Sequence, residues 1–79
     1  MKLTKAISIR IKELLQQRNI TQYRLSQLSG VPQSTISIIL KSEIQTVKLS
    51  TIYEICAGLN IEIAEFFDRD YFTLQNITD

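Results

Sequence analysis

The stretch that decides the fold runs from Thr21 to residue 40 and is TQYRLSQLSGVPQSTISIIL. Thr21 is placed to cap a short helix that carries Leu25 and Leu28 on its apolar face. Gly30 follows, where helices commonly end in a left-handed conformation, and Pro32 suits the first turn of a second helix. This order predicts two short helices joined by a tight turn, which is either a helix-turn-helix or an αα-hairpin that only packs.

Apolar residues within this stretch and on both sides of it recur at helical spacing. The predicted faces are Ile7, Ile11, Leu14 and Leu15 in a first helix capped by Thr4; Ile36, Ile39 and Leu40 in the third; and Leu49, Ile52, Tyr53, Ile55, Cys56 and Leu59 in the fourth. Residues 41–47 lose the period and are expected to form a loop, Asn60 to end the fourth helix, and residues 62–67 to form a short fifth helix. We therefore predict an all-α fold of five helices.

Composition restricts the possible chemistry. The 79 residues include no His and a single cysteine, Cys56, so His-based dyads and an intrachain disulfide are excluded. We expect Cys56 to be a buried small apolar residue rather than a redox sensor. We expect no enzyme activity, cofactor, metal or small-molecule substrate. No apolar run approaches the about 18 residues of a membrane span, so we expect a cytoplasmic protein.

The net charge of +1 conceals a gradient along the chain. Residues 1–24 hold six Lys or Arg side chains against Glu13 alone, and residues 25–60 are neutral. Residues 61–79 hold five carboxylates against Arg69 alone. A basic half suits a polyanion, although charge by itself fits an ordinary solvated surface equally well.

Several segments, in order, resemble the DNA-binding domain of the phage repressor and Cro (Xre-like) family. They are Arg10-Ile-Lys-Glu-Leu, Asn19-Ile-Thr-Gln, residues 25–37, residues 52–61 and Phe66-Phe67. The resemblance covers about residues 7–67 and implies a compact, lambda-repressor-like five-helix domain whose third helix enters the major groove of double-stranded DNA, usually as a homodimer. The chain departs from the family after the third helix, where Lys41-Ser42 replaces the usual Asn-Gly.

Helical phase separates the third helix into an inward and an outward side. The residues predicted to contact bases are Gln33, Ser34, Ser37 and Ile38. A Gln amide carries a donor and an acceptor that match adenine N6 and N7. Ile38 is an unusual outward apolar residue, and contact with a thymine methyl, simple exposure and a protein contact remain open for it.

The resemblance also implies contacts with the DNA backbone. The residues predicted to contact phosphate are Gln22, Tyr23, Thr35, Lys41, Ser42 and Lys48. Arg10 and Lys12 are weaker candidates, because surface ion pairing explains them equally well.

We interpret residues 1–79 as a single helix-turn-helix domain with its core at about 5–68. The tail, residues 69–79, contains Tyr71, Phe72, Leu74 and Ile77, and either packs back on the domain or forms a dimer contact. The predicted function is a sequence-specific transcriptional regulator, most simply a repressor. Two alternatives stay open: the controller protein of a restriction–modification system, and an antitoxin-type module that mainly holds a protein partner.

Overall fold

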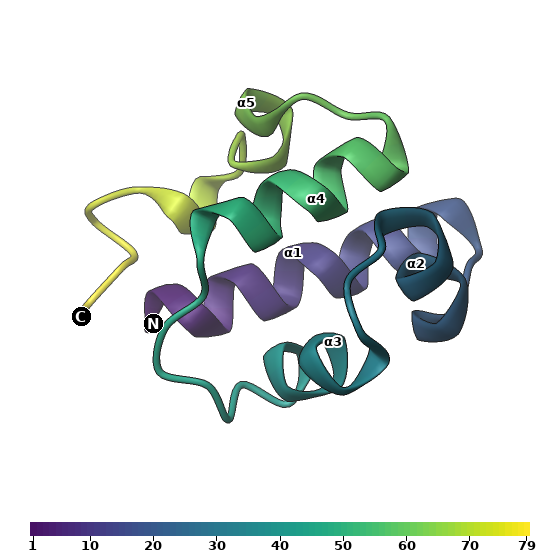
Figure 1. Cartoon of the computed structure of the whole chain (residues 1–79). Helices are drawn as coiled ribbons and strands as arrows, with labels where there is room; N and C mark the ends of the chain where they lie inside the picture. The colour runs from purple at the N-terminus through teal and green to yellow at the C-terminus, as the bar shows by residue number, and fades with distance from the viewer.

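The computed structural model describes residues 1–79 and contains helices without strands. The elements are α1 (Leu3–Arg18), α2 (Gln22–Ser29), α3 (Gln33–Leu40), α4 (Leu49–Leu59), α5 (Ile63–Phe66) and the 3₁₀ turn η1 (Asp70–Phe72). In Figure 1, α1 crosses the middle of the molecule with α3 on one side and α4 on the other, and α5 lies beyond α4. The all-α prediction with five α-helices is confirmed. The helices all lack the length and apolar character needed to cross a membrane.

The ends of α1 and α4 follow directly from their sequences. Asn19 and Asn60 adopt left-handed conformations with φ of 53° and 57°, which Asn tolerates better than most residues. The next amides fold back, so that Ile20 donates to the Leu15 carbonyl and Ile61 to the Cys56 carbonyl. Both isoleucines then pack against the core. Each Asn-Ile pair therefore stops a helix and turns the chain inward.

The beginning of α1 is capped from a distance and not locally. The predicted cap at Thr4 is wrong: the N-cap residue is Lys2, two residues earlier, and it supplies no side-chain hydrogen bond. Instead the Leu3 amide donates to Asp79 Oδ1 at 2.6 Å, and the Thr78 amide donates to the Met1 carbonyl at 2.9 Å. The two ends of the chain accordingly lie side by side in Figure 1.

The core consists of thirteen buried apolar residues drawn from every α-helix and from the turn between α2 and α3. Cys56 is among them, as predicted, and burial raises the pKa of its thiol. Phe66 is fully buried, and Phe67 packs edge-on against it with ring centroids 4.9 Å apart. Phe72 extends this aromatic cluster from the tail, with its ring 5.0 Å from that of Phe67. The tail therefore packs back on the domain at Phe72, whereas Leu74 is almost fully exposed.

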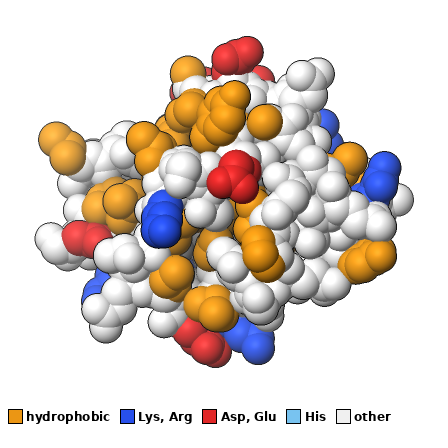
Figure 2. Space-filling model, in the orientation of Figure 1, with side chains coloured by type: hydrophobic (Ala, Val, Ile, Leu, Met, Phe, Trp, Pro, Cys, Tyr) orange, Lys and Arg blue, Asp and Glu red, His pale blue; other side chains and the backbone are white.

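Three residues predicted to face the core are instead exposed. Leu28 is 40% exposed, Leu49 64% and Tyr53 58%. The prediction assigned them by apolar character, but the arc of α4 that meets other elements is narrower than its apolar arc, and Leu49 and Tyr53 fall at its edge. Figure 2 shows apolar side chains distributed over the surface of the face that it presents.

The expectation that Arg10 lies on the surface is also wrong. Arg10 is 1% exposed, and its guanidinium donates from Nε to the Phe66 carbonyl at 2.7 Å and from Nη2 to the Glu65 carbonyl at 3.0 Å. Its third partner is Glu13, whose Oε1 also accepts from Arg69 Nε at 2.8 Å. Arg10 therefore satisfies the carbonyl end of α5 and ties it to α1, because the carbonyls in the last turn of a helix lack partners within the helix.

Candidate nucleic-acid interface

The turn between α2 and α3 is held by one serine hydroxyl. Ser29 Oγ donates to the Leu25 carbonyl at 2.7 Å and accepts from the Val31 amide at 3.1 Å. Gly30 has φ of 78°, in the left-handed region, and its amide donates to the Ser26 carbonyl at 2.9 Å. Thr21 caps the start of α2 as predicted, accepting from the Arg24 amide. The stretch is therefore a helix-turn-helix with a closed turn, rather than two helices loosely connected.

The eight residues of α3 divide into an inner and an outer side. Ile36, Ile39 and Leu40 are buried in the core. The outer side carries the predicted base-contacting residues, with Gln33, Ser34 and Ile38 exposed and Ser37 half-buried. None of the polar side chains in this set forms a hydrogen bond within the molecule, so their donors and acceptors are free to meet a partner. Ile38, at 42% exposure, adds an apolar contact to this otherwise polar surface.

The predicted phosphate-contacting residues flank this surface. Lys41 and Lys48 are exposed at the two ends of the loop between α3 and α4, whereas Thr35 and Gln22 are half-buried. Tyr23 is exposed, and its hydroxyl accepts a hydrogen bond from Gln27 Nε2 at 3.1 Å, which restricts the ring on the surface of α2.

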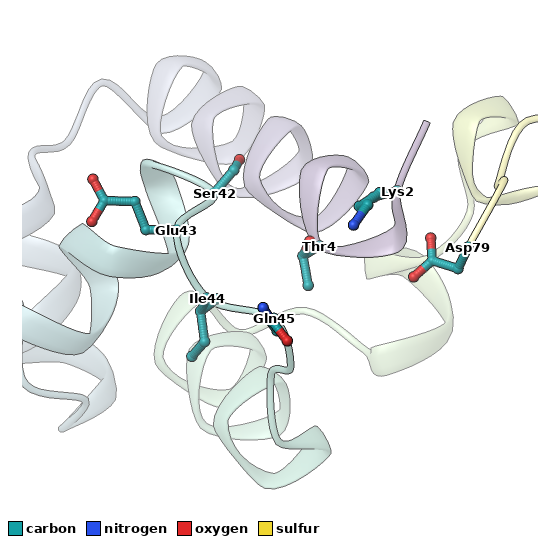
Figure 3. Close-up of a pocket in the computed structure, with 7 residues that line it drawn as sticks. All are labelled: Lys2, Thr4, Ser42, Glu43, Ile44, Gln45 and Asp79. Carbon is teal, nitrogen blue, oxygen red and sulfur yellow. The ribbon is translucent and has the colours of Figure 1, made fainter.

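Ser42 does not fit the predicted role. Its φ of 58° is left-handed, and the reversed chain lets the Ser42 amide donate to the Ile39 carbonyl and the Glu43 amide to the Ile38 carbonyl. This is the geometry of a Schellman motif, in which Gly is usual at the position that Ser42 takes. The Ser42 Oγ is buried without a hydrogen-bond partner, and Figure 3 shows the side chain directed toward α1. A phosphate contact through this hydroxyl is therefore inconsistent with the structure.

A polar pocket of about 400 Å³ lies beside this loop (Figure 3). Its lining comes from the start of α1, the loop after α3 and the end of the tail: Lys2, Thr4, Ser42, Glu43, Ile44, Gln45 and Asp79. This set contains one lysine and two carboxylates, so this edge of the interface carries no basic excess.

The charge gradient along the sequence becomes a gradient across the molecule. Arg10 is buried and adds nothing to the surface charge, which leaves the five exposed cations Lys2, Lys5, Lys12, Arg18 and Arg24 in the N-terminal third. Four of the five carboxylates of residues 61–79 lie on or next to α5 and η1. In Figure 1 α5 lies on the opposite side of α4 from α3, and η1 lies beside the N-terminal end of α4 and contacts α1. The acidic segments thus lie away from the outer side of α3.

Two Glu13 partners also perturb its ionisation. Burial raises the pKa of Glu13. Hydrogen bonds and charge attraction from Arg69 and Arg10 lower it by more than burial raises it, so the pKa lies below the ordinary 4.5. The carboxylate therefore stays ionised to a lower pH than an ordinary glutamate, and its hydrogen bond with Arg69 holds the tail against α1.

Small residues that the sequence analysis passed over position the two helices of the motif. Gly58 on α4 lies so close to α2 that a Cβ there would come within 2.8 Å of Ser29 Cα. Ser8 on α1 is fully buried, and its Oγ donates to the Leu40 carbonyl at the end of α3, at 2.8 Å. A small residue on a helix face is the only sequence signal for such contacts, and it does not name the partner.

A helix-turn-helix whose second helix presents exposed, unpaired polar side chains defines the class of helix-turn-helix DNA-binding proteins. The chain matches the family model of the Cro/C1-type HTH DNA-binding domain over residues 10–70, and it belongs to that family. The expected resemblance is thereby confirmed, and the protein is a DNA-binding transcription regulator. No curated protein and no solved structure matches the chain.

Proposed function

We propose that this protein is a sequence-specific repressor that inserts α3 into the major groove of double-stranded DNA. The observation that carries the proposal is the outer side of α3, where Gln33 and Ser34 are exposed at its N-terminal end without partners in the molecule. The N-terminal residues of a recognition helix are the ones that meet base edges. Repression is the simplest outcome, because a protein bound at a promoter excludes polymerase without any activating contact.

Gln33 is the principal base-reading residue in this proposal. Its amide offers a donor and an acceptor in the geometry of adenine N7 and N6, a match that is specific in the major groove. Ser34 and Ser37 have short hydroxyls that serve either a base edge or a phosphate. Ile38 contacts a thymine methyl, which accounts for an exposed isoleucine in the middle of the outer side.

The backbone contacts come from Gln22, Tyr23, Thr35, Lys41 and Lys48 in this proposal. Only the two lysines are charged, so few counterions are released on binding and the affinity falls only gradually with added salt. Specific binding then depends more on the base contacts of α3 than on charge.

We further propose that two copies bind together, with residues 1–79 acting as one unit in each. Two α3 helices related by a two-fold axis reach half-sites about one helical turn, roughly 34 Å, apart. Footprinting on the selected operator checks this spacing, and protection of a single half-site would contradict it.

The decisive experiment compares Gln33→Ala with the unchanged protein on two duplexes: an operator selected from a random DNA pool, and a random sequence of equal length. Loss of a bidentate contact is worth about 1–3 kcal/mol, so we expect the operator affinity to fall about ten- to hundredfold and the random-sequence affinity to change little.

The matched control is Gln75→Ala, which removes an exposed glutamine from the tail and leaves both affinities unchanged. Equal losses of Gln33→Ala on the two duplexes would show that Gln33 does not read bases. Failure of the unchanged protein to select any operator would refute the proposed function and favour a protein-interaction module.

A further inference from the structure

The last four carbonyls of α3 all find partners, and one partner is unlike the others. Three of the donors are backbone amides of the loop that follows: Lys41 to the Ser37 carbonyl, Glu43 to the Ile38 carbonyl and Ser42 to the Ile39 carbonyl. The last carbonyl, that of Leu40, accepts from Ser8 Oγ on α1, 32 residues away in sequence. The C-terminal end of α3 is thus tied to the body of the protein by a side chain.

This hydrogen bond is the only one that connects α3 to a segment remote in sequence. The other attachments of α3 to the body are apolar contacts of Ile36, Ile39 and Leu40. Apolar contacts are not directional, so they restrict the position of a helix along the contact surface less sharply than a hydrogen bond does. The Ser8–Leu40 hydrogen bond is directional, since its length and angle restrict both the shift and the rotation of α3.

Ser8 is well suited to this task. Ser8 is completely buried, so water does not compete for its hydroxyl. The distance of 2.8 Å from Ser8 Oγ to the Leu40 carbonyl oxygen is normal for a hydroxyl donor. In the interior of α1 its side chain is short enough for α3 to approach closely. If this hydrogen bond broke, the buried hydroxyl and the buried carbonyl would both be left without a partner. That cost favours the single arrangement of α3 in which the bond forms.

We propose that Ser8 is a positioning residue for sequence discrimination, which sets the register of α3 relative to α1 and hence the height of Gln33 in the groove. This inference rests on the proposed function of α3. Base contacts require α3 at one position, whereas phosphate contacts tolerate small displacements. If only a fraction of molecules hold α3 in that position, the apparent operator affinity falls by that fraction.

The test uses the full chain with Ser8→Ala, which removes the donor and keeps a small side chain. Ile55→Val on α4 is the matched control, because it trims the same core and keeps both partners of the Ser8–Leu40 hydrogen bond. We expect Ser8→Ala to lower operator affinity about tenfold and random-sequence affinity less than twofold, since an unmade buried hydrogen bond shifts an equilibrium by about that factor. Ile55→Val should lower neither at a temperature where it remains folded.

Amide hydrogen exchange supplies a second measurement that does not depend on DNA. We expect Ser8→Ala to accelerate exchange at Lys41, Ser42 and Glu43 by more than its change in global stability explains. In Ile55→Val, exchange at these three amides should change only as much as global stability does. Should Ser8→Ala be poorly folded, Ser8→Cys keeps a weak donor of similar size and is expected to give a smaller loss of discrimination in the same direction.

The two proposals fail separately in this design. If the unchanged protein selects an operator and Ser8→Ala discriminates as well as it does, the role of Ser8 is refuted and the proposed function stands. If the unchanged protein selects none, the proposed function is refuted. Unchanged exchange at Lys41, Ser42 and Glu43 in Ser8→Ala would independently refute the attachment of α3 through Ser8.

Discussion

Replacing Gly58 with alanine sets two known effects against each other. Gly58 lies in α4, where alanine is the better helix former by about 1 kcal/mol. A Cβ at this position would lie 2.8 Å from both Ser29 Cα and Ser29 N and 2.9 Å from the Leu28 carbonyl carbon. These three atoms are backbone, so they cannot rotate aside as a flexible side chain would.

The geometry decides the sign. Ordinary contact begins at 3.4 Å, so α2 must move away from α4 by several tenths of an ångström along its C-terminal turn. Overpacking of a well-packed site costs about 1–3 kcal/mol, and the rigid neighbours place this site in the upper part of that range. After the gain in helix propensity, we expect Gly58→Ala to lower the free energy of unfolding by about 1–2 kcal/mol. For a domain of this size that corresponds to a fall in Tm of about 5–15 °C.

The assay is urea unfolding followed by circular dichroism, with the slope compared between variants so that a change in midpoint reports stability alone. Ala57→Gly, one residue earlier and exposed, measures the helix propensity of α4 without the contact and should destabilise by about 1 kcal/mol. A Gly58→Ala protein as stable as the original, or more stable, would refute the close approach of α2 and α4.

The remaining predictions concern a strained residue and an ion pair. Ser42→Gly should raise the free energy of unfolding by about 1 kcal/mol, because it removes a left-handed non-glycine residue and a buried unpaired hydroxyl, and these gains exceed the opposing effect of the greater freedom of glycine in the unfolded chain. Thermal unfolding checks this, and a lower Tm would contradict it. Glu13 has a lowered pKa in the folded state, so its contribution to stability is present above about pH 4.5 and is lost as the pH falls through the folded-state value. Glu13→Gln should therefore be less stable at neutral pH and should lose less stability on acidification. Urea midpoints from pH 7 to about pH 3 test this, and equal acid slopes would show that the carboxylate does not hold Arg10 and Arg69.

Much of the candidate site could be predicted from local sequence. Gly30 indicates the turn through its preference for left-handed backbone, and Thr21 indicates the start of α2 through its preference for the N-cap position. Both preferences depend on only a few neighbouring residues. The outer position of Gln33 follows from helical phase once Ile36 and Ile39 are assigned to the core. The exposure of these residues was predictable for the same reason, although their contacts with DNA remain predictions.

The errors concern residues whose environment is made by a distant segment. Arg10 is charged and its phase in α1 fits either side, so only the carbonyl end of α5 explains its burial. Ser42 looked like a loop hydroxyl near phosphate, but its left-handed backbone turns the side chain toward α1. Leu49 and Tyr53 are apolar residues that no neighbouring element covers.

The sequence alone determined the order of the helices, the turn between α2 and α3, and which residues lie on the outer side of α3. These features depend on backbone preferences and on apolar periodicity, which are properties of residues close together in the chain. The tertiary structure decided how α3 and its outer side are positioned relative to the other helices. A hydrogen bond from Ser8 to Leu40, the missing Cβ of Gly58 and the buried guanidinium of Arg10 each join segments far apart in sequence. Such contacts need two specific partners at one distance, and that information exists only once the chain is folded.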